Sequence, residues 1–171
     1  GPCGAGAYIR IPRVSMQFVE KETLDAEKVI TLEKYQALGN GTNNQGELYA
    51  IKLALQQIKQ YEKTAKTKLE PQIKIEIFTD STYTINMLSN NWKANANIQL
   101  IEDIKKDVIE RNETNPIVWH WCAGHMDIEY NEKAHDLATI AAHEAEYSLI
   151  GHNRKRRISS QPTIDPTSPY R

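Results

Sequence analysis

The sequence predicts an α/β domain in which helices flank a mixed sheet. Three β-like runs come first, within residues 7–38, and helix-like and strand-like segments alternate from there to residue 147. The order β-β-β-α-β-α-α-β-α is typical of an antiparallel meander followed by strands that helical crossovers join. Apolar residues make up 40% of the 171 residues and charged residues 25%, a composition that can bury a core.

The first three predicted elements are strands. Residues 7–11 follow a glycine-rich turn, and residues 14–21 are also strand-like. Residues 24–39 are compatible with a helix or a strand, and their weak alternation favours a strand that ends near Leu38, where two glycines interrupt it.

The remaining elements have stronger signals. A helix over about 43–61 carries apolar residues at helical spacing, and a lysine-rich loop then ends at Pro71. The stretch "QIKIEIFTD" alternates as a strand does and puts Asp80 at its carboxyl end. The later elements, in chain order, are a helix from a Ser81 cap to Leu88, an amphipathic helix over 98–111, a strand over 115–122, a loop over 123–130 and a helix over 131–147.

Charge and cysteine content restrict the classes of protein to consider. Residues 150–171 carry a formal charge of +4 and include Arg154, Lys155, Arg156 and Arg157, so the remaining body is acidic. We expect residues 1–149 to form one domain and residues 150–171 to be a disordered, Ser/Pro-rich basic tail. No apolar run reaches the ~18 residues of a membrane span, and no signal peptide is evident. Two cysteines without a CxxC pair fit an intracellular setting, cytoplasm or nucleus.

Two carboxylates stand out by position. Glu47 opens the apolar stripe of the 43–61 helix, where an unpartnered charge is costly to bury. Asp80 lies at a strand's carboxyl end, where sites form in open α/β sheets. Alone, Glu47 could be a first-turn acid favoured by the helix dipole, and Asp80 a helix cap. As a pair, they are the oxygen ligands that Mg²⁺ prefers.

Three blocks carry a family resemblance. "GTNNQGELYAI", "IFTDSTYTI" and "WHWCAGHMDIEYNEKAHDLA" resemble the type 1 ribonuclease H patterns TNNxxEL, TDSxYV and WVxGHxGxxxNExAD. Their order and spacing match over roughly residues 1–142. The resemblance implies a ribonuclease H-like fold with a mixed five-stranded sheet, and hydrolysis of the RNA strand of RNA/DNA hybrids. Two Mg²⁺ ions would act on the scissile phosphate, leaving 5′-phosphate and 3′-hydroxyl ends.

The resemblance also implies residue roles. Glu47 and Asp80 would bind metal, and His125, in the loop after the last strand, would assist proton transfer or product release. Contacts to RNA 2′-hydroxyls or the DNA phosphate, by which RNA is told from DNA, would come from Thr42, Asn43, Asn44, Ser81 and Asn97.

The sequence departs from the family pattern in three places. The family's central first strand, which ends in a metal-binding aspartate, would lie before Gly1, so we expect it to be missing from this chain. His135 stands in place of the last helix's aspartate, and Asp136 is a less favoured ligand because it is rotated ~100° around the helix. Imidazole suits softer ions than Mg²⁺, so Mn²⁺ is a possible cofactor. The loop over 90–97 is too short for a basic protrusion that some members carry, and residues 154–157 are a candidate replacement.

Two functions remain open at this point. The first is the hybrid-cleaving endonuclease, as a monomer or as part of a larger polyprotein. The second is a catalytically degenerate module that binds nucleic acid or another protein, for example from a reverse transcriptase or mobile element. The intact Glu47, Asp80 and His125 favour the enzyme, whereas His135 and the missing strand favour the second. An integrase or resolvase is a weaker third interpretation, because those proteins lack the TNN block and the GH loop.

Overall fold

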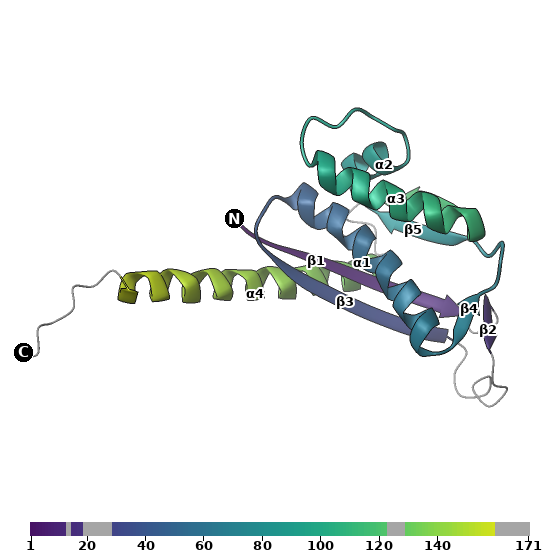
Figure 1. Cartoon of the computed structure of the whole chain (residues 1–171), viewed down its shortest axis with the longest axis horizontal. Coiled ribbons are helices and arrows are strands. Elements are labelled where there is room, and N and C mark those ends of the chain that lie inside the picture. The colour runs from purple at the N-terminus through teal and green to yellow at the C-terminus, as the bar shows by residue number, and fades with distance from the viewer. Residues whose placement is uncertain (13–14, 19–28, 123–128, 160–171) are drawn as a thin grey trace, which may run out of the picture.

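A computed structural model of the chain (Figure 1) describes residues 1–12, 15–18, 29–122 and 129–159. The α/β class is confirmed. The elements in chain order are β1 (Pro2–Pro12), β2 (Met16–Phe18), β3 (Val29–Asn40), α1 (Asn43–Thr64), β4 (Thr67–Leu69), β5 (Ile75–Thr79), α2 (Thr82–Leu88), α3 (Ile98–Thr114), β6 (Ile117–Trp121) and α4 (Glu129–Ser159).

The described strands form three two-stranded sheets and not one five-stranded sheet. β1 pairs with β3 in antiparallel fashion, and β5 pairs with β6 in parallel fashion. The expected three-strand meander is wrong, because β2 pairs with β4, in a region predicted as loop. The backbone N–H of Glu70 donates to the Ser15 carbonyl at 2.7 Å and extends this small pairing by one bond.

Helix α1 joins the two larger sheets. Leu53 packs against Ala5 and Ala7 of β1, whereas Leu48, Ile51 and Leu55 belong to a cluster with α2 and α3. Side chains of β5 and β6, including Ile77 and Trp119, pack against that second cluster. Within the described strands, β1 pairs only with β3 and β5 only with β6. Each of these two strands therefore has a second edge without a strand partner in the described part of the chain.

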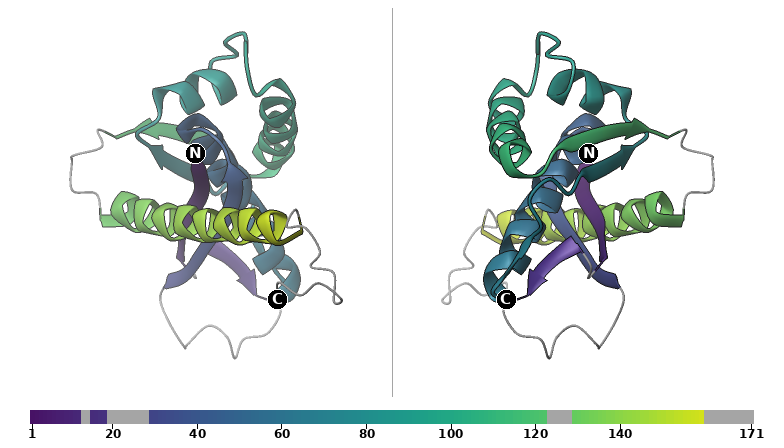
Figure 2. Two further views of the ribbon diagram at one scale, coloured as in Figure 1. Left: turned by 90° about the vertical axis from the view of Figure 1, so that its left-hand side faces the viewer. Right: turned by 90° about the vertical axis from the view of Figure 1, so that its right-hand side faces the viewer.

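Helix α4 lies across the β1–β3 sheet (Figures 1 and 2). A Cβ atom added at Gly4 would lie 2.4 Å from the Ala142 nitrogen, and one at Gly6 would lie 2.4 Å from the Ala138 nitrogen. The strand thus touches the helix backbone directly, and only glycine permits so close an approach. The buried Leu137 lies on the same side of α4, which fixes the rotation of the helix about its axis.

Helix α4 is longer than the sequence predicted. It begins at Glu129 and continues to Ser159, so residues 150–159 are helical and the expectation of a disordered tail from residue 150 is wrong there. Lysine and arginine are good helix formers, a single glycine at 151 costs only ~1 kcal/mol, and the first proline comes at 162. Residues 160–171 lie outside the described part. No described helix is long and apolar enough to cross a membrane.

Candidate active site

The N-terminus of α1 is fixed by a capping box. Thr42 is the N-cap, and its hydroxyl accepts from the Gln45 backbone N–H at 3.2 Å. In return, the side-chain oxygen Oε1 of Gln45 accepts from the Thr42 backbone N–H at 2.9 Å. Asn43 and Asn44 are the first two helical residues, both exposed. The first turn of α1 contains no acidic residue, so Glu47 is not explained as a first-turn acid.

Asp80 lies between β5 and α2 but does not cap the helix. Ser81 is the N-cap of α2, and its hydroxyl accepts from the Thr84 N–H at 3.1 Å. The Asp80 carboxylate is therefore not used as a cap, and the residue is exposed. The Trp121 indole N–H donates to the Asp80 carbonyl at 3.2 Å, and the Cys122 N–H donates to the Thr79 carbonyl at 2.9 Å. These bonds hold the carboxyl ends of β5 and β6 together beneath Asp80.

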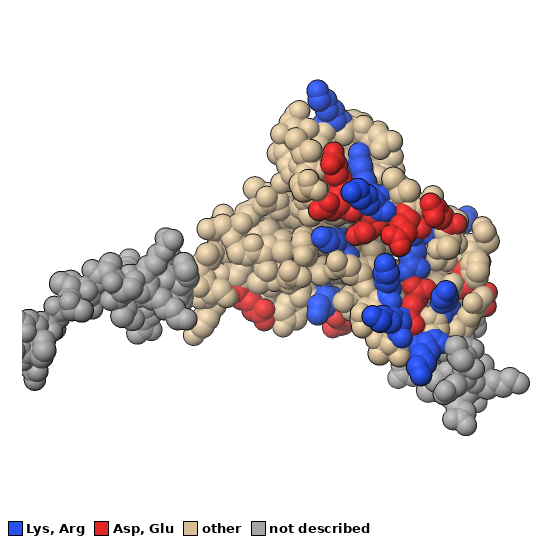
Figure 3. Space-filling view, in the orientation of Figure 1, with Lys and Arg blue, Asp and Glu red and all other residues tan. Residues whose placement is uncertain are grey.

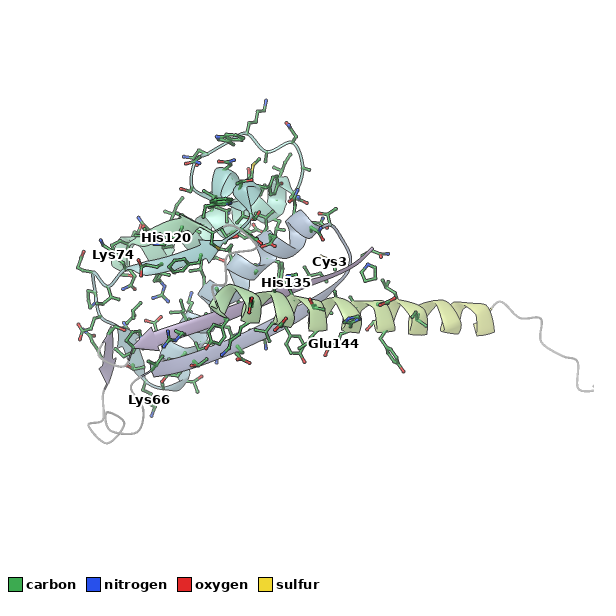
Figure 4. The ribbon with its side chains drawn as sticks, turned by 180° about the vertical axis from the view of Figure 1, so that it is seen from behind. Cys3, Lys66, Lys74, His120, His135 and Glu144 are labelled. Carbon is green, nitrogen blue, oxygen red and sulfur yellow. The ribbon has the colours of Figure 1, made fainter. Side chains whose placement is uncertain are left out.

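Three charged groups from three elements act on one another at this edge. Burial raises the pKa of the half-buried Glu47, the negative charge of Asp80 raises it further, and His135 on α4 lowers it. Of these two neighbours, only His135 favours the ionised form of Glu47, and burial and Asp80 outweigh it. Figure 4 shows His135 on the first part of α4, which runs alongside β1.

Cys122 is a neighbour of the carboxylates that the sequence interpretation missed as a site residue. Burial raises the pKa of its thiol, and the charges of Asp80 and Glu47 raise it further. The available signal was its position directly after β6, at the same sheet edge as Asp80. The thiol is 6% exposed, and its surroundings keep it neutral.

The donor set is suited to a hard divalent cation but is incomplete in the described residues. The Asp80 carboxylate raises the pKa of Glu47, and carboxylate oxygens are ligands that a hard divalent cation prefers. No group of three or more His, Cys, Asp or Glu side chains among the described residues is arranged to hold a metal ion. His135 and Asp136 are both exposed, and His125 lies outside the described residues.

Three polar side chains, those of Gln45, Asn97 and Tyr83, form a hydrogen-bond chain beside α1. The Gln45 amide N–H donates to Asn97 Oδ1 at 3.1 Å, and the Asn97 amide N–H donates to the Tyr83 hydroxyl at 3.2 Å. The structure therefore brings together Thr42 and Asn97, two predicted nucleic-acid contacts that lie far apart in the sequence. Gln45 and Tyr83 were missed, because their partners are distant along the chain.

Charges on the visible face do not form a single-sign surface. Lysine and arginine side chains intermingle with acidic ones over α1 and α3 (Figure 3). Two ion pairs join α1 and α3, one between Lys59 and Glu110 at 3.7 Å and one between Arg111 and Glu62. On this face, binding of a polyanion has to rely on local hydrogen bonds and bound cations more than on the net field.

The fold is an α/β domain in which Glu47 of α1 and Asp80, at the carboxyl end of β5, interact electrostatically. Comparison with known proteins specifies the class further. The family model described as RNase H matches residues 15–143. The chain belongs to the RNase H family.

Curated relatives agree with this assignment. The chain is similar to proteins named Ribonuclease H from Erythrobacter litoralis (32% identity over 83 residues, 43% of this chain and 57% of the relative) and Psychromonas ingrahamii (32% over 111 residues, 59% and 65%). A third, from Hahella chejuensis, is 31% identical over 117 residues, 61% of this chain and 69% of the relative. The chain thus spans between 57% and 69% of the length of these relatives.

Proposed function

We propose that this chain is the main part of an endonuclease that hydrolyses the RNA strand of RNA/DNA hybrids with two divalent ions, Mg²⁺ or Mn²⁺. The observation that supports this most directly is the electrostatic interaction of Glu47 with Asp80 and His135 at the carboxyl edge of β5. Family membership over residues 15–143 supports the same proposal. The products would be 5′-phosphate and 3′-hydroxyl ends, and the protein would act inside the cell, in cytoplasm or nucleus, as a monomer or within a polyprotein.

The proposal assigns each side chain a task. Glu47, Asp80 and His135 would hold the ions, with Asp136 less favoured. The ions would supply charge neutralisation at the phosphate and a more acidic water. Thr42, Asn43, Asn44, Ser81 and Asn97 would bind the two strands, and His125 would move a proton or help product leave.

A further strand completes the proposal. We infer that a strand ending in an aspartate precedes β1 in the full protein and pairs with the second edges of β1 and β5. The support is that both strands pack with α1 and that each is paired on one edge only within the described strands. Its aspartate would add the donor that the described residues do not supply.

The test is cleavage of an end-labelled RNA/DNA hybrid in Mg²⁺, with single-stranded RNA and duplex DNA as controls. It uses both this chain and the longer product of its gene. We expect RNA-strand cleavage by the longer product and at least about 100-fold slower cleavage by its Glu47→Gln and Asp80→Asn variants. The exposed Glu102→Gln variant is the charge-matched control and should cleave normally. Wild-type rates in both site variants would contradict the proposed roles.

A second candidate, a catalytically degenerate module, is favoured by His135 standing in place of a carboxylate. The same longer product decides between the two candidates through His135→Asp. If His135 is a ligand, this change should raise Mg²⁺-supported cleavage relative to Mn²⁺-supported cleavage by about tenfold, equivalent to about 1.4 kcal/mol. Glu146→Gln, at an exposed position further along α4, is the control. An unchanged metal preference would remove His135 from the site, and hybrid binding without cleavage in either ion would support the degenerate module.

A further inference from the structure

We propose that Gln45 is a positioning residue that fixes the amide of Asn97, and through it the Tyr83 hydroxyl, so that both present hydrogen-bond donors to a backbone phosphate of the bound hybrid. The inference rests on the proposed function, which supplies the nucleic-acid substrate. It adds Gln45 and Tyr83 to the binding machinery, and it gives a physical reason for their arrangement.

The direction of the hydrogen-bond chain is set at one end by the backbone. The Thr42 N–H can only donate, so the Gln45 side chain must turn its carbonyl oxygen toward it, at 2.9 Å. The Gln45 amide nitrogen then faces Asn97 and donates to its oxygen at 3.1 Å. The Asn97 nitrogen is left on the opposite side, where it donates to the Tyr83 hydroxyl oxygen at 3.2 Å.

The hydrogen-bonding groups that remain unused in this hydrogen-bond chain are donors. The amide nitrogens of Gln45 and Asn97 each use one of two hydrogens in these bonds, and the Tyr83 hydroxyl accepts with its oxygen and keeps its hydrogen. All three side chains are half-buried, so each retains some contact with solvent. A phosphodiester offers only acceptors and is therefore the matching group, whereas a reversed Asn97 amide would turn its oxygen toward Tyr83.

The backbone at Asn97 indicates that this arrangement is not a by-product of helix capping. Asn97 occupies the N-cap position of α3, yet its side chain makes no capping bond. It adopts a left-handed conformation with φ of 56°, which asparagine tolerates better than most residues. The Asn97 amide is thus used in bonds to Gln45 and Tyr83 and not in a cap of α3.

Two substitutions at Gln45 distinguish the effect of its bond to the Thr42 N–H from the effect of its bond to Asn97. Gln45→Glu keeps an acceptor for the Thr42 N–H and hence the capping box, but it cannot donate to Asn97. Gln45→Met removes both interactions without adding charge. Gln56→Glu, an exposed position later in α1, is the control for added negative charge. Dissociation constants for a short RNA/DNA hybrid are measured with Ca²⁺ in place of Mg²⁺, together with thermal unfolding of each variant.

We expect both Gln45 variants to weaken hybrid binding by about tenfold while Gln56→Glu leaves it unchanged. The melting temperature should fall for Gln45→Met but not for Gln45→Glu, so the loss of affinity will not follow the loss of stability. Unchanged binding by Gln45→Met would overturn the inference. A loss confined to Gln45→Glu would do so as well, because it would reflect charge repulsion alone.

A second measurement distinguishes failure of the inference from failure of the proposed function. Side-chain amide resonances of Asn97 are followed by NMR during titration with dimethyl phosphate. We expect a shift in the wild-type protein that is lost in Gln45→Met. That result without any hybrid binding would reject the proposed function and retain the positioning role. An absent shift, or one that survives in Gln45→Met, would overturn the positioning role itself.

Discussion

Burial and the charge of Asp80 raise the pKa of Glu47, whereas His135 lowers it. The net effect is that the folded protein binds this proton more tightly than the unfolded chain does. The free energy of unfolding therefore falls as pH rises from the ordinary glutamate value of 4.5 through the raised folded value, and it stays lower above that window. Glu47 thus costs stability at neutral pH in the absence of a cation.

This effect predicts that Glu47→Gln is more stable than the wild type at pH 7 without divalent ions. We expect a gain of up to about 1 kcal/mol that disappears as pH falls below about 4.5, where the wild-type carboxyl is protonated in both states. Urea unfolding at several pH values measures it, with the exposed Glu102→Gln as control. A variant less stable than wild type at pH 7 would show that the carboxylate is favourably partnered.

Saturating Mg²⁺ should reverse the comparison, because an ion that binds only the folded wild type stabilises it by mass action. The same residue would then be destabilising alone and stabilising with its ion, as the repulsion from Asp80 implies.

At the scale of elements, the contact between β1 and α4 depends on two glycines. We expect Gly4→Ala to destabilise the protein by about 2–3 kcal/mol, because the new methyl group would lie 2.4 Å from a backbone nitrogen of α4, which cannot turn aside as a side chain can. Thermal unfolding measures the loss. Gly1→Ala is the matched control, since nothing lies within 4 Å of its Cβ position. Equal stability of the two variants would mean that α4 does not rest on β1 in solution.

Elements with local signals could be predicted, and pairings between distant segments could not. The helix that begins near residue 43 and the strand–turn–helix around Asp80 follow from neighbouring residues, and the structure confirms both. The β2–β4 pairing was not predicted, because each strand has only three residues and the two lie about fifty positions apart. The full length of α4 was not predicted, because the basic, Ser/Pro-rich composition of residues 150–171 is typical of a disordered tail. The first part of that segment, residues 150–159, nevertheless contains no proline.

The same division applies to the candidate site. Glu47 and Asp80 were found because a charge on an apolar stripe and a carboxylate at a strand end are visible in sequence. Gln45 could not be found, because its bond to Asn97 spans 52 positions. Cys122 was overlooked because a lone cysteine has no pattern of its own.

At the scale of the whole molecule, α1 is the common support of two separate sheets. Its one face contacts β1, and another contacts the cluster that includes side chains of β5 and β6. The Glu47 carboxylate, on the helix between them, is therefore placed by packing on both sides. A strand added between the sheets would leave that placement intact, since the helix already touches both.

The unexpected length of α4 sets the distance between His135 and the basic positions near its end. With a rise of about 1.5 Å per residue, position 154, where the basic run 154–157 begins, comes about 28 Å along the helix axis from His135. Successive nucleotides on one strand are about 3.4 Å apart, so that separation equals about eight steps of a duplex. If a bound duplex follows the axis of α4, one that extends fewer than about eight steps beyond the cut would end before position 154.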